Sequence, residues 1–231
     1  MKFEAGGEKF EVKFLALGLV GFMSLIYLLE ISIPGLAQSL SLEPSVFLQE
    51  PWTILTSIFA HSDTDIMHLV NNMFWLSIFG TVLERWIGSK RFIILFLASG
   101  VVANISAFTF YFNSTVLGAS GAVSGVIFAL AVLKPRSLGF SMGAPMPMWG
   151  VAVIWFLTNA LMSLADVSGI ASEAHIYGAI FGVIAGLYWK EGLDLKTKKD
   201  KKAREVKKAE EVEIPEEYIR EWERKYLVDQ D

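Results

Sequence analysis

A serine stands between glycines at the start of an apolar segment, residues 115–133, whose first turn reads Gly118, Ala119, Ser120, Gly121. Glycine lowers helix stability by about 0.5–1 kcal/mol relative to alanine, and a hydroxyl buried among apolar groups needs a hydrogen-bond partner. The segment therefore gives up helix stability for another purpose. Two purposes fit these residue types: close packing of two backbones, or presentation of Ser120 as a nucleophile.

Two of the three histidines also lie in apolar segments, His68 and His175, and Asn72 follows His68 by one helical turn. An imidazole can accept the proton of a serine hydroxyl, which then attacks a carbonyl carbon. His68 and Asn72 can donate hydrogen bonds to the resulting oxyanion, and the backbone amide of Ser120 near a helix N-terminus can add another. These residue types indicate nucleophilic catalysis by a serine and a histidine.

The composition places these residues in a membrane protein. The 231 residues are 53% hydrophobic and 19% charged, and the mean hydropathy is +0.46, which is too apolar for an ordinary soluble domain. Lys and Arg are absent from 14–84, 92–133 and 137–189. Because a helix crosses the hydrocarbon core with about 20 residues, each of these gaps accommodates two spans. The sequence predicts an all-α, polytopic membrane protein.

Six transmembrane helices are expected, at about 14–31, 66–82, 92–112, 115–133, 146–165 and 172–189. Basic clusters precede the first span and follow the second, fourth and sixth, which predicts that both termini are cytoplasmic. Residues 32–65 are rich in Pro and Ser and contain no Lys or Arg. We expect this segment to form a long outer first loop.

By composition the chain divides into a cytoplasmic N-terminal segment (1–13), a six-helix membrane domain (14–190) and a charged cytoplasmic tail (191–231). The basic run Lys196–Lys208 is a candidate for contact with anionic lipid headgroups, although charge runs usually form a solvated tail. Pro215 is suited to open a short helix.

The depths of the polar residues can be compared, because spans two, four and six all run inward and end at basic residues. Counted back from those residues at about 1.5 Å per residue, Ser120, His175 and Asn72 lie about 20–22 Å from the inner boundary, and His68 lies about 25 Å from it. In a core about 30 Å thick, all four lie roughly 5–10 Å below the outer boundary. They are therefore expected to form one layer.

Small residues at a spacing of four let helix backbones approach closely in lipid. The glycines expected to pack the fourth span against the sixth are Gly118, Gly121, Gly125, Gly178, Gly182 and Gly186. Close approach of these two spans would bring Ser120 within reach of His175.

No carboxylate is expected at the depth of Ser120 and His175, which predicts a Ser–His dyad without an aspartate. Glu173 and Asp166 lie nearer the outer surface. We expect no metal site, because neither a carboxylate nor a thiolate accompanies the histidines at this depth. No cofactor and no nucleic-acid partner are expected, and His61 is expected to have a structural role.

The order of these motifs resembles the rhomboid family of intramembrane serine proteases. The similarity covers about 51–186 and includes PWTILTSIFAH (51–61), HLVNNM (68–73), LERWIGSKRF (83–92), GASGAVSG (118–125) and AHIYGAIFG (174–182). In this chain Ser124 stands where some relatives have an aromatic residue one turn after the serine.

The resemblance implies Ser120 as the nucleophile, His175 as the general base, and His68, Asn72 and the Ser120 amide as the oxyanion site. It also implies a six-helix bundle whose first loop lies partly in the outer leaflet. The fifth span and the loop Asp166–Ala171, with Gly169 as a hinge, are the candidates for a movable entrance.

The sequence thus predicts a serine endopeptidase that cleaves transmembrane proteins near the outer face of the plasma membrane, with membrane-spanning substrates and the lipid bilayer as its partners. One alternative is a catalytically inactive rhomboid-like protein that binds and guides transmembrane clients. Another is a transporter or channel, but the apolar inner halves of the spans argue against it.

Overall fold

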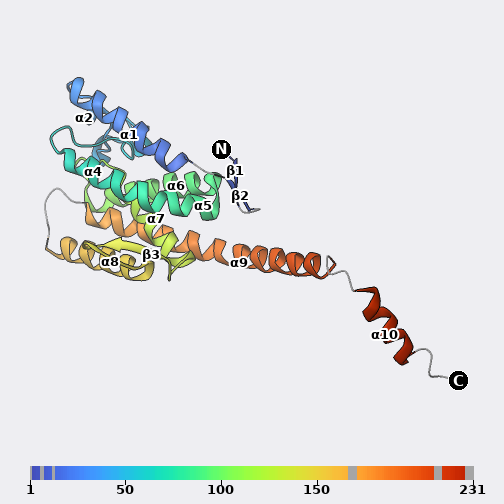
Figure 1. Cartoon of the computed structure of the whole chain (residues 1–231). Coiled ribbons are helices and arrows are strands. Elements are labelled where there is room, and N and C mark those ends of the chain that lie inside the picture. Colours follow the sequence, from blue (N-terminus) through green and yellow to red (C-terminus); the bar gives the residue numbers. More distant parts are fainter. Residues whose placement is uncertain (1, 6–7, 12–13, 166–170, 211–214, 227–231) are drawn as a thin grey trace. The chain divides into compact units, whose positions relative to one another are not determined.

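The computed structural model of the protein describes residues 2–5, 8–11, 14–165, 171–210 and 215–226 (Figure 1). The chain forms two compact units, Met1–Trp189 and Lys190–Asp231. The second unit contains α10 (Glu216–Tyr226), which begins directly after Pro215, where a helix was expected.

The first unit consists mainly of helices, and the predicted all-α class is confirmed. The main helices are α1 (Leu15–Ser32), α4 (Ile66–Trp75), α5 (Thr81–Ile87), α6 (Ser89–Phe110), α7 (Ser120–Leu133), α8 (Met148–Leu164) and α9 (Ser172–Glu210), of which the residues up to Trp189 belong to this unit. A π-helical turn, η2 (Leu76–Gly80), joins α4 to α5 without a break. The first loop carries the short helices α2 (Leu36–Leu40), η1 (Pro44–Val46) and α3 (Thr53–Thr56).

Within the described residues, three helical segments are long and apolar enough to cross a membrane: Leu15–Ser32, Ile66–Ile87 and Ser89–Phe110. Two shorter apolar helices, Ser120–Leu133 and Met148–Leu164, lie where the fourth and fifth spans were expected. The sixth expected span corresponds to the beginning of α9. These helices indicate a multi-pass membrane protein.

The outward faces of the helices are apolar, as α1 illustrates. Its buried residues recur every three or four positions and so form one stripe: Ala16, Leu19, Met23, Tyr27 and Glu30. On its other faces Phe22, Leu25 and Leu28 are 50%, 58% and 56% exposed. A helix that is apolar all round is suited to lipid on the faces that the protein does not cover.

The helix that carries the serine begins later than the sequence suggests. α7 starts at Ser120, whereas residues 115–119 form an irregular segment in which Val116 pairs with Leu42 in an isolated antiparallel bridge. Gly118 has a φ of +113°, a conformation that side chains disfavour, and its amide donates to the Ser57 carbonyl at 2.8 Å. Ser120 is therefore the first residue of the helix, where backbone N–H groups have no acceptor within the helix.

Two hairpins were not expected from the sequence. β1 (Lys2–Ala5) pairs with β2 (Glu8–Glu11), and β3 (Leu138–Ser141) pairs with β4 (Ala144–Pro147), both antiparallel. The second hairpin turns at Met142 and Gly143, which have φ values of 50° and 79°. Because β4 includes Pro147, α8 starts at Met148, slightly later than the predicted span.

The centre of the bundle is α7, in which ten of 14 residues are buried. A Cβ atom placed on Gly178 or Gly182 of α9 would collide with the carbonyl oxygen of Gly121 or Gly125 of α7, and one on Gly186 would lie 3.3 Å from the Cα of Ala129. α7 and α9 therefore touch backbone to backbone. On the other side of α7, Cβ atoms on Gly121 and Gly125 would collide with Ala103 and Ser99 of α6.

We predict that Gly182→Ala destabilises the protein by about 1–3 kcal/mol, the usual range for overpacking a tight interior, because the new methyl group meets the backbone of Gly125. Gly18→Ala is the matched control, since no atom lies within 4 Å of the added group. Thermal unfolding in detergent measures both changes. Equal melting temperatures for the two variants would contradict the backbone contact between α7 and α9.

Candidate active site

The packing of α7 against α9 brings Ser120 and His175 together. Ser120 is the first residue of α7, and His175 lies in the first turn of α9. The Ser120 Oγ lies 2.6 Å from the His175 Nε2, which is a hydrogen-bond distance. Both side chains are half-buried. An imidazole nitrogen in this position can accept the hydroxyl proton and so make the serine oxygen a nucleophile.

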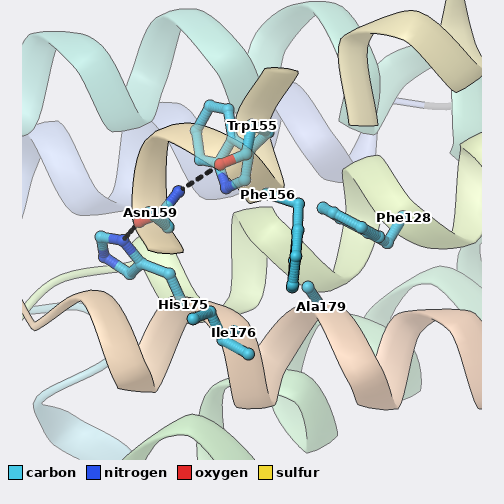
Figure 2. A pocket seen from close by; sticks show the side chains of 7 residues that line it. All are labelled: Phe128, Trp155, Phe156, Asn159, His175, Ile176 and Ala179. Atoms are coloured by element: carbon cyan, nitrogen blue, oxygen red, sulfur yellow. Dashed lines mark hydrogen bonds between the residues drawn. The ribbon is translucent and has the colours of Figure 1, made fainter. Parts of the chain in front are cut away.

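The other ring nitrogen of His175 contacts a residue that the sequence analysis did not identify. The Nδ1 of His175 lies 2.6 Å from the Oδ1 of Asn159, on α8. Figure 2 shows Asn159 between His175 and the backbone of Trp155. The depth comparison could have found Asn159, because it lies six residues before the expected outer end of the fifth span, or about 9 Å.

Next to these groups is a narrow pocket between α7, α8 and α9 (Figure 2). It is too tight to hold a water molecule. Its lining consists of aromatic and aliphatic side chains together with Asn159 and His175: Phe128, Trp155, Phe156, Asn159, His175, Ile176 and Ala179. Apolar side chains therefore pack the His175 ring against α8.

The buried residue Ser124 connects α7 to α8. Its Oγ donates to the carbonyl of Ser120 at 2.8 Å and accepts the indole N–H of Trp155 at 3.1 Å. An aromatic side chain thus approaches Ser124 from α8.

The structure places His68 and Asn72 of α4 beside the turn that precedes Ser120. A Cβ atom on Gly118 would lie 2.5 Å from the His68 Nε2 and 3.7 Å from the Asn72 Nδ2. The missing side chain at Gly118 therefore leaves room for both groups. Position 118 therefore needs a glycine for two reasons: its positive φ, and the lack of space for a Cβ atom beside His68.

Asn72 and His68 differ in the hydrogen bonds that their side chains make. The Asn72 Nδ2 donates to the His68 carbonyl at 3.0 Å and to the His61 Nε2 at 3.3 Å. To bind an oxyanion, Asn72 would have to exchange one of these bonds, and the bond to His61 is the longer. Within the described part of the chain the imidazole of His68 makes no hydrogen bond, so it can donate to a ligand.

His61 is a buried connection between the first loop and α4. Its backbone amide donates to both carboxylate oxygens of Glu30 at 3.1 Å, and its Nδ1 lies 3.2 Å from the carbonyl of Phe59. Because a carbonyl only accepts, Nδ1 carries the proton and Nε2 accepts from Asn72. Burial, with a smaller contribution from the charge of His68, lowers the pKa of His61 to about 4. His61 is therefore neutral in the folded protein above that pH.

Glu173, the described one of the two acidic residues near the expected site, is hydrogen-bonded away from His175. The carboxylate of Glu173 accepts hydrogen bonds from Tyr111 and, at 2.6 Å, from Ser163, rather than from His175. Asp166 and Gly169, like most of the loop proposed as an entrance, lie outside the described residues. Within the described residues, no group of three His, Cys, Asp or Glu side chains could hold a metal ion.

Comparison with known proteins identifies one family. The family profile described as the Rhomboid domain matches residues 48–191. The chain is 33% identical over 193 residues to the rhomboid protease GluP of Bacillus subtilis, a match that covers 79% of this chain and 35% of that protein.

Two eukaryotic relatives are also similar. The chain is 32% identical over 149 residues to Rhomboid-like protein 11, chloroplastic, of Arabidopsis thaliana, covering 60% of this chain and 51% of that one. It is 26% identical over 159 residues to Rhomboid protein 1, mitochondrial, of Saccharomyces cerevisiae, covering 64% and 44%. The matches thus span about a third to a half of the length of these relatives.

We predict that His61 makes the protein less stable in acid. The unfolded chain binds a proton at this residue below about pH 6.5, whereas the folded protein resists protonation down to about pH 4. The contribution of neutral His61 to the free energy of unfolding is therefore fully present above pH 6.5. It falls by about 2 kcal/mol between pH 7 and pH 5. Unfolding of the wild type and of His61→Gln in detergent at both pH values measures this loss. The same pH dependence in both proteins would contradict the prediction.

Proposed function

Because the chain belongs to the rhomboid family, we propose that it is an intramembrane serine endopeptidase that hydrolyses peptide bonds of transmembrane proteins. The observation that carries this proposal is the 2.6 Å contact between the Ser120 Oγ and the His175 Nε2. We assign Ser120 as the nucleophile and His175 as the general base.

The proposed reaction follows from this geometry. The Nε2 of His175 takes the hydroxyl proton while the Ser120 Oγ attacks the scissile carbonyl carbon. The protonated imidazole then gives this proton to the leaving amine, and an acyl-enzyme remains on Ser120. A water molecule, deprotonated by the same nitrogen, hydrolyses the ester and restores the serine.

The negative charge that develops on the carbonyl oxygen needs donors that are already in place. We assign this role to the backbone amide of Ser120, to the imidazole of His68 and to the Nδ2 of Asn72. The position of Ser120 at the first residue of α7 supports the assignment, because the N–H groups at a helix N-terminus favour negative charge. The room left by Gly118 beside His68 and Asn72 also supports it.

The bonds of a transmembrane helix are shielded by its own hydrogen bonds, so cleavage requires that the substrate unwinds locally. We propose that the cut lies near the outer face, with small residues around the bond and helix-weakening Gly or Pro below it, as the family resemblance implies. We also propose that both termini are cytoplasmic, that the membrane is the plasma membrane, and that Lys196–Lys208 contacts anionic lipids. Some relatives carry mitochondrial or chloroplastic names, so the membrane itself requires a direct localisation experiment.

We predict that the wild-type protein, reconstituted in liposomes, cleaves a transmembrane test substrate, and that Ser120→Ala and His175→Ala abolish cleavage. Ser106→Ala is the control, because it also removes a buried hydroxyl, which bonds only the Ala103 carbonyl within its own helix. Gel analysis of the products, with melting curves for each variant, measures the effect.

Cleavage by folded Ser120→Ala would contradict the proposed mechanism. Absence of cleavage by the wild type across several substrates and lipid compositions would instead favour the inactive, client-binding alternative.

We predict that His68→Ala lowers kcat about a hundredfold, the loss typical of one oxyanion donor, with little change in KM. Val70→Ala is the control on the same helix. The Val70 side chain is exposed, so its truncation is expected to leave kcat within about twofold of the wild-type value. Steady-state kinetics with the liposome substrate separate kcat from KM. A His68→Ala variant that is folded and as fast as Val70→Ala would exclude His68 from the oxyanion site.

A further inference from the structure

We propose that Asn159 is a positioning residue that fixes the tautomer and the orientation of the His175 ring. The proposal rests on the proposed function, since it concerns the base of the same reaction. It adds a third, uncharged member to the predicted dyad, supplied by α8 rather than by α7 or α9.

The hydrogen bonds of Asn159 fix the orientation of its amide. Its Nδ2 lies 2.8 Å from the backbone carbonyl of Trp155, one turn earlier on α8. A carbonyl oxygen only accepts, so the group that faces it must be the NH₂ and not the amide oxygen. The Oδ1 of Asn159 is thereby turned toward His175 (Figure 2).

This orientation determines which ring nitrogen of His175 carries the proton. The Oδ1 of Asn159 can only accept, and it lies 2.6 Å from the His175 Nδ1, so Nδ1 must be the protonated nitrogen. A neutral imidazole carries one N–H, which leaves Nε2 with a free lone pair. This lone pair faces the Ser120 Oγ at 2.6 Å. The backbone of α8 therefore determines, through one amide, that His175 can act as a base.

A neutral amide suits position 159 better than a carboxylate would. Asn159 is only 6% exposed and lies among Trp155, Phe156 and Phe128. A charge buried in such surroundings is strongly penalised, whereas an amide with both ends bonded is not. Asn159 thus performs the orienting role of the aspartate in a Ser–His–Asp triad without its charge.

The contacts close into a ring of hydrogen bonds across three helices. Trp155 donates its indole N–H to Ser124, and Ser124 donates to the carbonyl of Ser120, so α8 is bound to α7 one turn below the nucleophile. The ring orders Asn159 from both sides. Glu173 does not compete for His175, because its carboxylate is bonded to Tyr111 and Ser163.

A spectroscopic experiment tests the tautomer without requiring cleavage. The 231-residue chain contains three histidines, so its ¹⁵N-histidine NMR spectrum in micelles is simple, and His175→Gln assigns the signals of His175. We expect Nδ1–H in the wild type and a substantial fraction of Nε2–H in Asn159→Leu. If His175 carries Nε2–H in the wild type, or if Asn159→Leu leaves its tautomer unchanged, the proposal is wrong. This result holds even if the wild type cleaves no substrate, which separates it from a failure of the proposed function.

Kinetics in liposomes supply the second readout. Asn159→Leu should lower kcat roughly ten- to a hundredfold, the range expected for loss of one hydrogen bond to an ionising base, with KM changed less than about threefold. The control is Ser106→Ala, which removes a buried side-chain hydrogen bond on α6 and should change kcat less than about threefold. Equal kcat values for the two variants would overturn the proposal.

Asn159→Asp keeps the test decisive if Asn159→Leu does not fold. The variant retains the acceptor, so it should remain active. Its carboxylate can ionise when the adjacent imidazolium forms, and this pairing should move the acid limb of the kcat/KM profile to higher pH by about one unit or more. The other titratable groups that act on His175, Glu173 and His68, are unchanged in this variant. An acid limb at the wild-type pH would show that position 159 does not act on the base and would overturn the proposal.

Discussion

The direct contact between the backbones of α7 and α9 is the constraint on which the rest of the site depends. Any side chain at Gly178 or Gly182 would meet the carbonyl of Gly121 or Gly125, so the two helices can be this close only with glycine. In lipid, where burial of apolar surface does not drive helices together, such close packing is a principal source of association. It also sets the distance from Ser120 on α7 to His175 on α9. Gly121 after Ser120 thus serves helix packing, whereas Gly118 before it forms the turn beside His68 and Asn72.

A polar site inside an apolar bundle is stable only if its groups are bonded, since an unpartnered polar group in hydrocarbon is costly. Here a closed ring of hydrogen bonds links five residues, each bonded to the next: Ser120, His175, Asn159, Trp155 and Ser124. All five are uncharged when the histidine is neutral. The network can thus lie within the bundle without a fixed charge. In the proposed reaction, negative charge develops only transiently, beside the donors assigned to α4 and the start of α7.

Much of this arrangement could be predicted from the sequence, because in the predicted topology basic residues mark the inner ends of the spans, and depth then follows from helix geometry. That comparison placed Ser120, His175, His68 and Asn72 in one layer, and the structure brings the four close together in the bundle. It did not identify Asn159, since a single amide in an apolar helix shows no partner in the sequence. The start of α7 at Ser120 was also missed, because the positive φ of Gly118 depends on contacts with Ser57 and His68 from distant segments.

The central claim is that His175 makes Ser120 a nucleophile within the membrane. It is tested most directly by treating the folded protein with a fluorophosphonate and locating the adduct by peptide mass spectrometry. We predict one adduct per chain, on Ser120. In His175→Ala the same adduct should form much more slowly. An adduct on a different serine, or labelling of Ser120 at the same rate without His175, would contradict it.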